Sequence, residues 1–279
     1  MQKVWFITGC SKGFGLALTE ELLKSTDAKV VATARHPESL DEQFNEYKDR
    51  LLVLKLDVTK QADIDQAVKD AVKRFGRIDV LVNNAGYGLI GALEECPMDE
   101  IRHLFDTNVF GLMAVIKAVL PQMRAQKSGY ILNLSSIAGL AANPGSGLYS
   151  STKFAVEGLS EALAGELAQF GIKVIIIEPG PFRTDFAGES IHKAPALGDY
   201  HDNQAIEMRN YIKQAHGHQK GDPHKAVKIW IQLTEMKDPP LRILLGRAAY
   251  DRFEHKLEIY SAELEKNKSV TLSADYDEA

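Results

Sequence analysis

Short apolar segments rich in β-branched residues recur along the chain, and stretches with helical periodicity separate them. These segments are Val4–Ile7, Lys29–Thr33, Leu51–Leu56, Val80–Asn83, Tyr130–Leu134, Lys173–Glu178 and Leu241–Leu245. Several are apolar at nearly every position, which is typical of strands covered by helices on both faces. Strands that alternate with helices pair in parallel through right-handed crossovers. We therefore predict a doubly wound α/β fold, with a seven-stranded, mostly parallel sheet and helices on both faces.

Two of the segments between these runs carry clear helical patterns. One has a single apolar face formed by Ile64, Val68, Val72 and Phe75. The other, Ser151–Phe170, carries leucines at every fourth position. Both patterns match the stripe that a helix buries against a core. Because seven strands fill one sheet of this kind, we predict a single domain that spans residues 1–279.

The segment Phe186–Pro223 interrupts the alternation of strands and helices. It is polar, contains several glycines and prolines, and shows a short helical signal only near Gln204–Ala215. Long inserts in compact domains are often functional, so we expect residues 186–223 to form a lid over the substrate. A helical extension is expected at about 247–279, with a charged helix over Tyr250–Lys266 and a frayed acidic tail after it.

The composition excludes several classes of function. The formal net charge of −5 offers no basic surface for nucleic acid or for an anionic membrane. No uninterrupted apolar run approaches the ~18 residues of a membrane span. The first residues do not resemble a signal peptide, because Gly9, Ser11 and Lys12 interrupt their apolar stretch. The two cysteines, Cys10 and Cys96, lack metal-type spacing and suit a reducing cytosol, so we expect a cytoplasmic protein.

Five histidines gather in or near the insert: His192, His201, His216, His218 and His224. Their spacing matches no known metal-binding motif, and a metal site would need them ordered by further partners. Polar loop histidines are far commoner than metal ligands. We therefore predict no metal site.

The first apolar run leads directly into a glycine-rich turn, Thr8–Gly15, and then into a helix. Gly9, Gly13 and Gly15 would let the backbone approach a pyrophosphate closely, and the helix N-terminus would supply N–H groups and a positive dipole end. The spacing Gly-x3-Gly-x-Gly differs from the G-x-G-x-x-G form. Glycine-rich turns also serve merely to pack a helix against a strand. The loop alone is therefore compatible with both a dinucleotide site and a structural turn.

The end of the second strand bears on the choice of cofactor. Folds that prefer NAD place an acid on the adenosine ribose about 20 residues after the glycine loop. Here that position is Arg35, and no acid is within reach. An arginine fork suits a 2′-phosphate, and Lys12 would add a second cation. The alternative is that both are solvated surface charges, but their placement and the missing acid together favour NADP(H).

Tyr149 and Lys153 stand four residues apart at the start of a predicted helix, on one of its faces. Tyrosine titrates near ~10 and is a poor base at neutral pH. A neighbouring ammonium and an oxidised nicotinamide ring would favour the phenolate. Ser136 ends the preceding strand, where its hydroxyl could hydrogen-bond a carbonyl as charge develops. Taken alone, a Tyr-x3-Lys pair also occurs on ordinary surface helices.

These motifs occur in an order that resembles the short-chain dehydrogenase/reductase family, in its compact single-domain form. After the glycine loop they are Asp57-Val58, Asn83-Asn84-Ala85-Gly86, Asn108, Ser136 thirteen residues before Tyr149-x3-Lys153, and Pro179-Gly180 with Thr184. The resemblance covers about Lys3 to Phe186 and implies a Rossmann fold. One departure is Pro181-Phe182-Arg183, where the family more often has an aliphatic residue beside the threonine, so Phe182 and Arg183 are expected to border the substrate.

The resemblance also implies a role for each motif. Asp57 and Val58 would contact the adenine, and Asn83 would stabilise the sheet beside the cofactor. Thr184 would bind the carboxamide, while Lys153 would bind the nicotinamide ribose. The expected catalytic residues are Ser136, Tyr149, Lys153 and Asn108. The expected cofactor-binding residues are Gly9, Ser11, Lys12, Gly13, Phe14, Gly15, Arg35, Asp57, Val58, Asn84, Ala85, Gly86, Tyr149, Lys153, Pro179, Gly180, Phe182 and Thr184.

Some of these roles have structural alternatives. The thirteen-residue spacing favours Ser136 over Ser135 as the catalytic serine. Asn108 would hold a water that connects Lys153 to solvent, or it would be a buried polar residue satisfied by the backbone. Asn84 and Ala85 would be either cofactor contacts or part of the loop structure.

The expected activity is the interconversion of a carbonyl and an alcohol by hydride transfer with NADP(H), and its small-molecule substrate stays open. A non-catalytic NADP sensor or scaffold is one alternative, but it would not need Ser136, Tyr149 and Lys153 together. A nucleotide-sugar epimerase or dehydratase is another, but those larger relatives carry a different glycine spacing and a full substrate domain.

The resemblance further implies a homodimer. In the family, helices corresponding to Ile101–Met123 and Ser151–Phe170 pair with their copies across a two-fold axis. The small residues on these helices are Ala114, Ala118, Ala155, Gly158, Ala162 and Gly165. The alternative is that these residues face the sheet. The charged helix at the C-terminus is expected to cover the second surface used in assembly and so to stop it at two copies.

Overall fold

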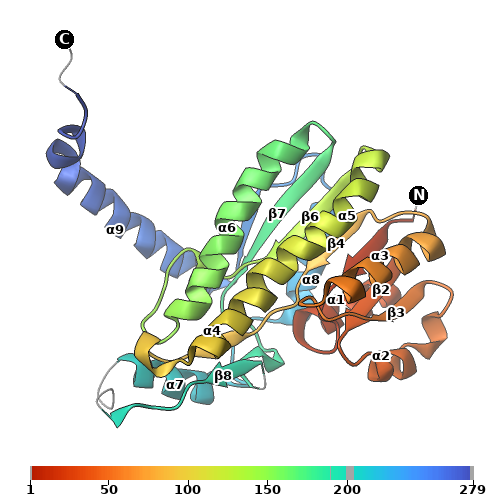
Figure 1. Cartoon of the computed structure of the whole chain (residues 1–279), viewed down its shortest axis with the longest axis horizontal. Coiled ribbons are helices and arrows are strands. Elements are labelled where there is room, and N and C mark those ends of the chain that lie inside the picture. Colours follow the sequence, from red (N-terminus) through yellow and green to blue (C-terminus); the bar gives the residue numbers. More distant parts are fainter. Residues whose placement is uncertain (1, 189, 199–203, 277–279) are drawn as a thin grey trace.

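The computed structural model describes residues 2–188, 190–198 and 204–276, and its centre is a seven-stranded sheet (Figure 1). The strands are β1 (Val4–Ile7), β2 (Lys29–Ala34), β3 (Leu51–Lys55), β4 (Val80–Asn83), β6 (Gly129–Leu134), β7 (Ile172–Pro179) and β9 (Arg242–Leu245). They run in the order β3-β2-β1-β4-β6-β7-β9, and every pairing is parallel. The predicted fold class is therefore confirmed.

Helices cover both faces of the sheet. The first face carries α1 (Gly13–Ser25), α2 (Glu38–Gln43) and α8 (Pro223–Glu235), and the second carries α3 (Gln61–Phe75), α5 (Leu112–Gln126) and α6 (Gly147–Ala168). Successive side chains of a strand point to opposite faces. Trp5 and Ile7 accordingly belong to the core under α1 and α8, whereas Val4 and Phe6 belong to the core under α3 and α5.

One helical segment, Met98–Gln126, joins α4 (Met98–Phe105), a π-helical turn η3 (Asp106–Gly111) and α5. By length and composition it is apolar enough to cross a membrane. Core helices of soluble proteins pass the same test, and Val115, Val119 and Met123 of this segment are packed in the core beneath the second face. The segment is therefore weak evidence for a membrane span.

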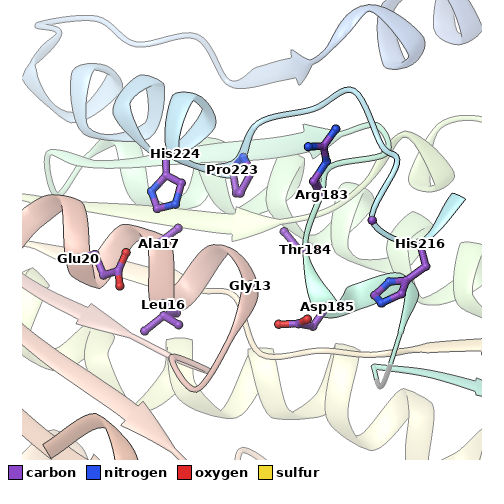
Figure 2. Close-up of a pocket in the computed structure, with 11 residues that line it drawn as sticks. Gly13, Leu16, Ala17, Glu20, Arg183, Thr184, Asp185, His216, Pro223 and His224 are labelled. Carbon is purple, nitrogen blue, oxygen red and sulfur yellow. The ribbon is translucent and has the colours of Figure 1, made fainter. Parts of the chain in front are cut away.

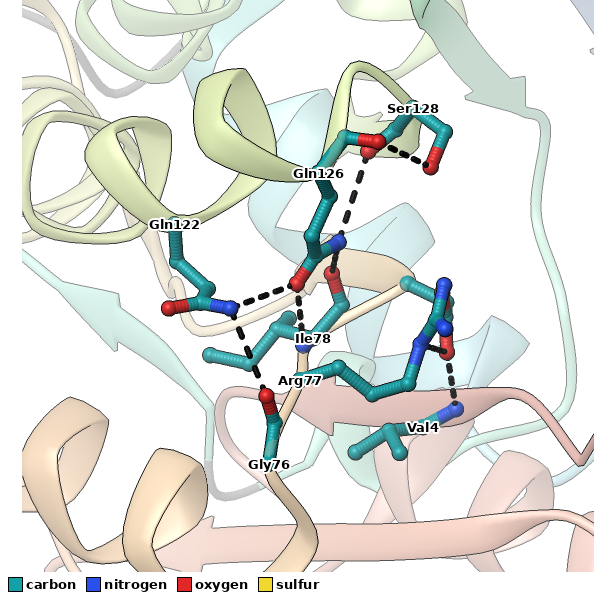
Figure 3. Close-up of polar contacts among 8 residues, drawn as sticks. Val4, Gly76, Arg77, Ile78, Gln122, Gln126 and Ser128 are labelled. Atoms are coloured by element: carbon teal, nitrogen blue, oxygen red, sulfur yellow. Dashed lines mark hydrogen bonds and ion pairs between the residues drawn. The ribbon is translucent and has the colours of Figure 1, made fainter.

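Polar contacts fix the amino end of β4, at the edge opposite the glycine loop (Figure 3). The side chain of Gln126, at the end of α5, accepts from the Ile78 N–H at 3.1 Å and donates to the Ile78 carbonyl at 2.8 Å. Asp79 accepts from the Val4 N–H at 2.8 Å and pairs with Arg77. These contacts fix α5 and β1 to the start of β4.

The insert forms more structure than the sequence predicted. Its helix α7 (Gln204–Ala215) lies where we expected it, but β8 (Ile191–Lys193) also pairs in parallel with β5 (Gly88–Ile90). A buried ion pair of 2.6 Å joins Arg209 of α7 to Glu95. Glu95 belongs to the short helix η2 (Leu93–Glu95), so the insert is tied to the main body. Of the insert's predicted histidines, His201 lies outside the described residues.

The C-terminal helix α9 (Arg247–Leu272) projects away from the rest of the molecule (Figure 1). Ala249 is its one buried residue, and the helix contacts β9 and the short helix η4 (Ile137–Gly139). The prediction that the chain frays after Lys266 was wrong, because the helix continues to Leu272. Tyr260 stacks on Lys256 within α9, so local contacts support the exposed helix.

Candidate active site

The glycine loop after β1 has the conformation that close approach to a phosphate requires. Gly9 and Gly13 adopt positive φ angles of 73° and 63°, which favour glycine. A Cβ on Gly15 would lie 2.3 Å from the Gly9 carbonyl oxygen, so no larger residue fits there. Because α1 begins at Gly13, its first-turn N–H groups lie beside this loop. The loop therefore fits a pyrophosphate group at the helix N-terminus.

Two residues after β4 hold the glycine loop in place. Asn84 Nδ2 donates to the carbonyls of Thr8 and Gly9, both at 2.9 Å. The Ala85 N–H donates to Thr8 Oγ1 at 3.1 Å. Asn84 and Ala85 thus have the structural role that we gave as an alternative, and their contact with a cofactor stays a prediction.

The candidate residues for the adenosine end follow β2 and β3. Arg35 is exposed directly after β2, and Asp57 is half-buried after β3. Burial raises the pKa of Asp57, but hydrogen bonds from Thr59 and the charges of Lys60 and Arg35 together hold it below its usual value. Arg35 is therefore near Asp57, at the same edge of the sheet. Val58 is buried next to them.

A cleft of about 330 Å³ opens between the start of α1 and the end of β7 (Figure 2). Its lining residues come from the glycine loop and α1, from the segment after β7, and from the end of the insert: Gly13, Leu16, Ala17, Glu20, Arg183, Thr184, Asp185, His216, Gly217, Pro223 and His224. Ligands of open α/β sheets bind outside the carboxyl ends of the strands. Gly13 and Thr184 were predicted to bind the cofactor, and both line this cleft.

Ser136, Tyr149 and Lys153 come together at the carboxyl edge of the sheet. Ser136 follows β6, where its Oγ accepts from the Ala138 N–H at 3.1 Å, and Tyr149 lies in the first turn of α6. Burial raises the pKa of Tyr149 well above its usual value, and a hydrogen bond with Ser136 lowers it. Lys153 Nζ lies 5.7 Å from the centre of the Tyr149 ring. The predicted constellation is therefore present in space.

Lys153 is the buried member of this group of three residues. Its ammonium donates to the Leu134 carbonyl at 2.6 Å. Burial lowers the pKa of Lys153 to about 8, and the charge of Glu157 acts in the opposite direction. A pKa near the working pH is typical of groups that take part in proton transfer.

Asn108 lies in the π-helical turn η3, close to Lys153. Its Oδ1 accepts from the Tyr87 N–H at 3.0 Å, and its Nδ2 donates to the Tyr87 carbonyl at 2.8 Å. A Cβ on Gly86 would meet Asn108 Oδ1 at 3.0 Å and Lys153 Nζ at 3.9 Å. The backbone of Tyr87 thus satisfies the Asn108 side chain, as in the alternative that we gave. Its expected role toward a water stays a prediction.

Aromatic residues border the site. Phe186 of the short helix η5 (Asp185–Ala187) lies with its ring centre 5.5 Å from that of Tyr149. Phe14 and Phe182 pack on one another at 5.2 Å, and Phe14 also packs on Trp230. These ring contacts therefore join the glycine loop to α8. The contact of Phe14 and Phe182 with a cofactor stays a prediction.

The remaining candidates lie in the loops that follow β1 and β7. Ser11 is exposed in the glycine loop, and Lys12 next to it is partly exposed. Pro179 ends β7 and accepts a hydrogen bond from Ser136 at 3.5 Å, and the Gly180 N–H donates to Leu245. The predicted site residues therefore lie at the carboxyl edge of the sheet, and their contacts with a ligand stay predictions.

Sequence reasoning missed one group close to this site. Glu157 of α6 is buried near Lys153, Glu178 of β7 is buried near Glu157, and Arg242 of β9 contacts both carboxylates. Glu157 stands four residues after Lys153, which is the spacing of neighbours on a helix face. Glu178 sits in a strand predicted to be covered on both faces, where a carboxylate is unusual. These two signals could have indicated the pair.

Comparisons with known proteins agree with this geometry. A family model described as short chain dehydrogenase matches residues 3–195. "Oxidoreductase BOA17" of Botryotinia fuckeliana is 40% identical over 275 residues, which cover 98% of this chain and 100% of that protein. A short-chain dehydrogenase structure from Streptomyces avermitilis has a TM-score of 0.92 and 40% identity, covering 99% and 100% of the two chains. The structure of ElxO with NADP bound has a TM-score of 0.71 and 32% identity, covering 88% and 96%.

Proposed function

Because this chain belongs to the short chain dehydrogenase family, we propose that it is an NADP(H)-dependent oxidoreductase that interconverts a carbonyl and an alcohol. The observation that carries this proposal is the position of Tyr149. Ser136 lies close enough to its hydroxyl to lower its pKa, and Lys153 Nζ lies 5.7 Å from the centre of its ring, at the edge of the sheet that also holds the glycine loop. A scaffold protein would not need these three side chains together.

In the proposed mechanism, each of the three residues acts on the reacting oxygen. When bound, NADPH supplies the hydride that reduces the carbonyl carbon. Tyr149 gives its hydroxyl proton to the carbonyl oxygen, and Ser136 donates a hydrogen bond to the same oxygen as negative charge develops. The Lys153 ammonium stabilises the phenolate that remains on Tyr149.

Two cations support the preference for NADP(H). Arg35 is exposed at the end of β2, where a 2′-phosphate would lie, and its charge reaches Asp57 after β3. Lys12 of the glycine loop supplies the second cation. ElxO, which is 32% identical to this chain, binds NADP, and this supports the choice.

The surroundings of Tyr149 favour a substrate with an apolar group beside its carbonyl. Phe186 contacts the Tyr149 ring, and it packs with Ile90, Ile191 and Ile212 in a buried apolar cluster of the insert. A carbonyl compound that reaches Tyr149 from the insert would meet these side chains.

An activity panel tests the proposal. Purified protein should oxidise NADPH, followed by its absorbance, with at least one member of a panel of aryl and alkyl ketones and aldehydes. NADH should be a poorer donor at equal concentration. Reduction of sugars in preference to apolar ketones would contradict the substrate class, and the absence of turnover with every carbonyl and alcohol would contradict the function.

A further inference from the structure

Two carboxyl groups lie buried behind the proposed catalytic lysine. The side chains of Glu157 on α6 and Glu178 on β7 are 8% and 1% exposed. Among the described residues, none offers any of their four oxygens a hydrogen bond of ordinary geometry. Unpaired carboxylates in such a place would be costly, because burial penalises the charged form. The pair therefore needs protons or cations.

The polar and charged groups that face the pair come from β9, α6 and the segment after β6. Arg242 of β9 lies 3.9 Å from Glu157 and 3.8 Å from Glu178, and it makes a closer ion pair of 3.0 Å with the exposed Glu161. Lys153 on α6 is the second cation, and Ser135 after β6 is a neutral neighbour whose hydroxyl lowers the pKa of Glu157. Two cations thus face three carboxylates. One proton on the buried pair would make this cluster neutral.

The burial of the pair favours a single shared proton. Burial raises the pKa of both carboxyls, and burial together with the charge of Glu157 raises the pKa of Glu178 to about 8. Like charges in a shared site cannot both ionise easily, so one group holds a proton while the other stays charged. Glu157 stands four residues after Lys153 on α6 and acts on its charge, so this position favours the negative charge on Glu157 and the proton on Glu178.

We propose that Glu157 and Glu178 are positioning residues of the active site, which hold one proton between them and present one negative charge that keeps Lys153 protonated. This inference rests on the proposed function for its effect on catalysis. Glu178 carries the proton, and Glu157 is the counter-ion that offsets the desolvation of the Lys153 ammonium. The charged Lys153 in turn stabilises the phenolate of Tyr149.

The shared proton is measured without cofactor or substrate. Infrared difference spectra of the folded protein in D2O, titrated through about pH 8, should show the C=O band of a protonated carboxyl disappearing. Glu178→Gln should remove this band. The exposed neighbour variant Glu161→Gln, which contacts the same Arg242, should keep it. Absence of the band in the parent protein, or its persistence in Glu178→Gln, would overturn the shared proton.

The effect on Lys153 is measured from the pH dependence of kcat/KM for carbonyl reduction. The charge of Lys153 is present below its pKa and lost above it, so reduction should slow as pH rises through this value. Glu157→Gln should lower the Lys153 pKa and move the fall in rate to lower pH, by on the order of one pH unit. Glu157→Asp, which keeps the charge, should restore most of the shift.

Two further variants distinguish a counter-ion role of Glu157 from a purely structural role. Glu178→Gln keeps the charge of Glu157, so it should shift the pH profile by clearly less than Glu157→Gln does. Glu161→Gln, at an exposed position, should leave the profile unchanged. Equal shifts in Glu157→Gln and Glu161→Gln, or no shift in a folded Glu157→Gln, would overturn the counter-ion role. If no carbonyl is reduced, the proposed function fails, whereas the infrared result still decides the shared proton.

Discussion

The hydroxyl of Tyr149 is a weak acid, and its buried position raises its pKa further. The residues around it must therefore lower this pKa for proton transfer. Burial raises its pKa, whereas the hydrogen bond with Ser136 lowers it. Lys153 approaches the ring to 5.7 Å and is itself held by the Leu134 carbonyl. A cofactor ring with positive charge would add to the same effect. In the proposed mechanism, the lysine charge and the cofactor therefore lower the pKa of Tyr149 together.

Tyr149→Phe should reduce turnover by at least about 100-fold, because phenylalanine cannot transfer a proton. The ring and its contact with Phe186 stay, so NADPH affinity should stay within a few-fold of the parent value. Steady-state absorbance and titration of NADPH fluorescence measure the two quantities. Near-normal reduction by this variant would exclude Tyr149 as the proton donor.

Arg35→Asp should weaken NADPH binding by roughly 10- to 100-fold, since it removes a charged hydrogen bond and places a carboxylate near the 2′-phosphate. NADH, whose ribose hydroxyl can donate to that carboxylate, should gain in kcat/KM. Lys225→Asp, an exposed cation on α8, is the control and should leave both cofactors unaffected. A parent enzyme that uses NADH as well as NADPH would refute the role of Arg35.

The sequence motifs predicted which residues meet at the candidate site, whereas the roles of these residues stay predictions. Ser136, Tyr149 and Lys153 meet in space because the strand end and the helix start that carry them are both fixed by the sheet. Glu178 was missed because it stands in an apolar strand and its partner Glu157 is distant in sequence. Only the pairing of β7 with β9 brings Arg242 to both.

Among the elements, the turn between β1 and α1 depends most strictly on sequence. Gly15→Ala should abolish or strongly weaken cofactor binding, because its Cβ would lie 2.3 Å from the Gly9 carbonyl and the loop would have to open. It should also destabilise the protein by about 1–3 kcal/mol, as overpacking does.

The matched control for this variant is Gly158→Ala in the interior of α6. A Cβ at Gly158 meets nothing within 4 Å in a single chain and lies away from the glycine loop, so alanine should leave NADPH affinity unchanged. Urea unfolding and NADPH titration measure the two effects. Normal cofactor affinity in Gly15→Ala would mean that the loop does not bind the pyrophosphate as proposed.

The positions of the strands and long helices could be predicted from the sequence, whereas the fold of the insert could not. The central strands carry continuous apolar runs, and each predicted bound lies within one residue of the observed one. The insert's strand Ile191–Lys193 is three residues long and pairs with another of equal length after β4. Such a short pair has no pattern of its own, since tertiary contacts such as the Glu95–Arg209 ion pair position it.

For the molecule as a whole, the exposed side of α6 supports the predicted homodimer. Gly158, Ala162 and Gly165 are exposed, so they do not face the sheet, whereas Ala114 and Ala118 of α5 pack against the core as in the alternative. Phe154 lies on the same side of the helix and is 42% exposed. Small residues beside an exposed aromatic allow a second helix to approach closely. Whether α9 limits assembly to two copies stays a prediction.

Ala162→Arg should convert the dimer to a monomer at micromolar concentration, because it places a long charged side chain in the helix contact. Ala62→Arg on α3 introduces the same residue at another exposed helical position and should leave the dimer intact. Sedimentation velocity distinguishes the states. A monomeric parent protein would contradict the homodimer, and a tetramer would show that α9 does not block further assembly.

The proposed reaction transfers hydride directly from the nicotinamide ring to the carbonyl carbon. The fate of a deuterium label on the cofactor measures this transfer. NADPH carrying deuterium on one face of nicotinamide C4 is incubated with a ketone that the protein reduces, and the alcohol is analysed by mass spectrometry. NADPH labelled on the opposite face is the control. We predict that one of the two labelled cofactors gives an alcohol with one deuterium on its carbinol carbon, and that Tyr149→Phe gives almost no product. An alcohol without deuterium from both cofactors would contradict the account.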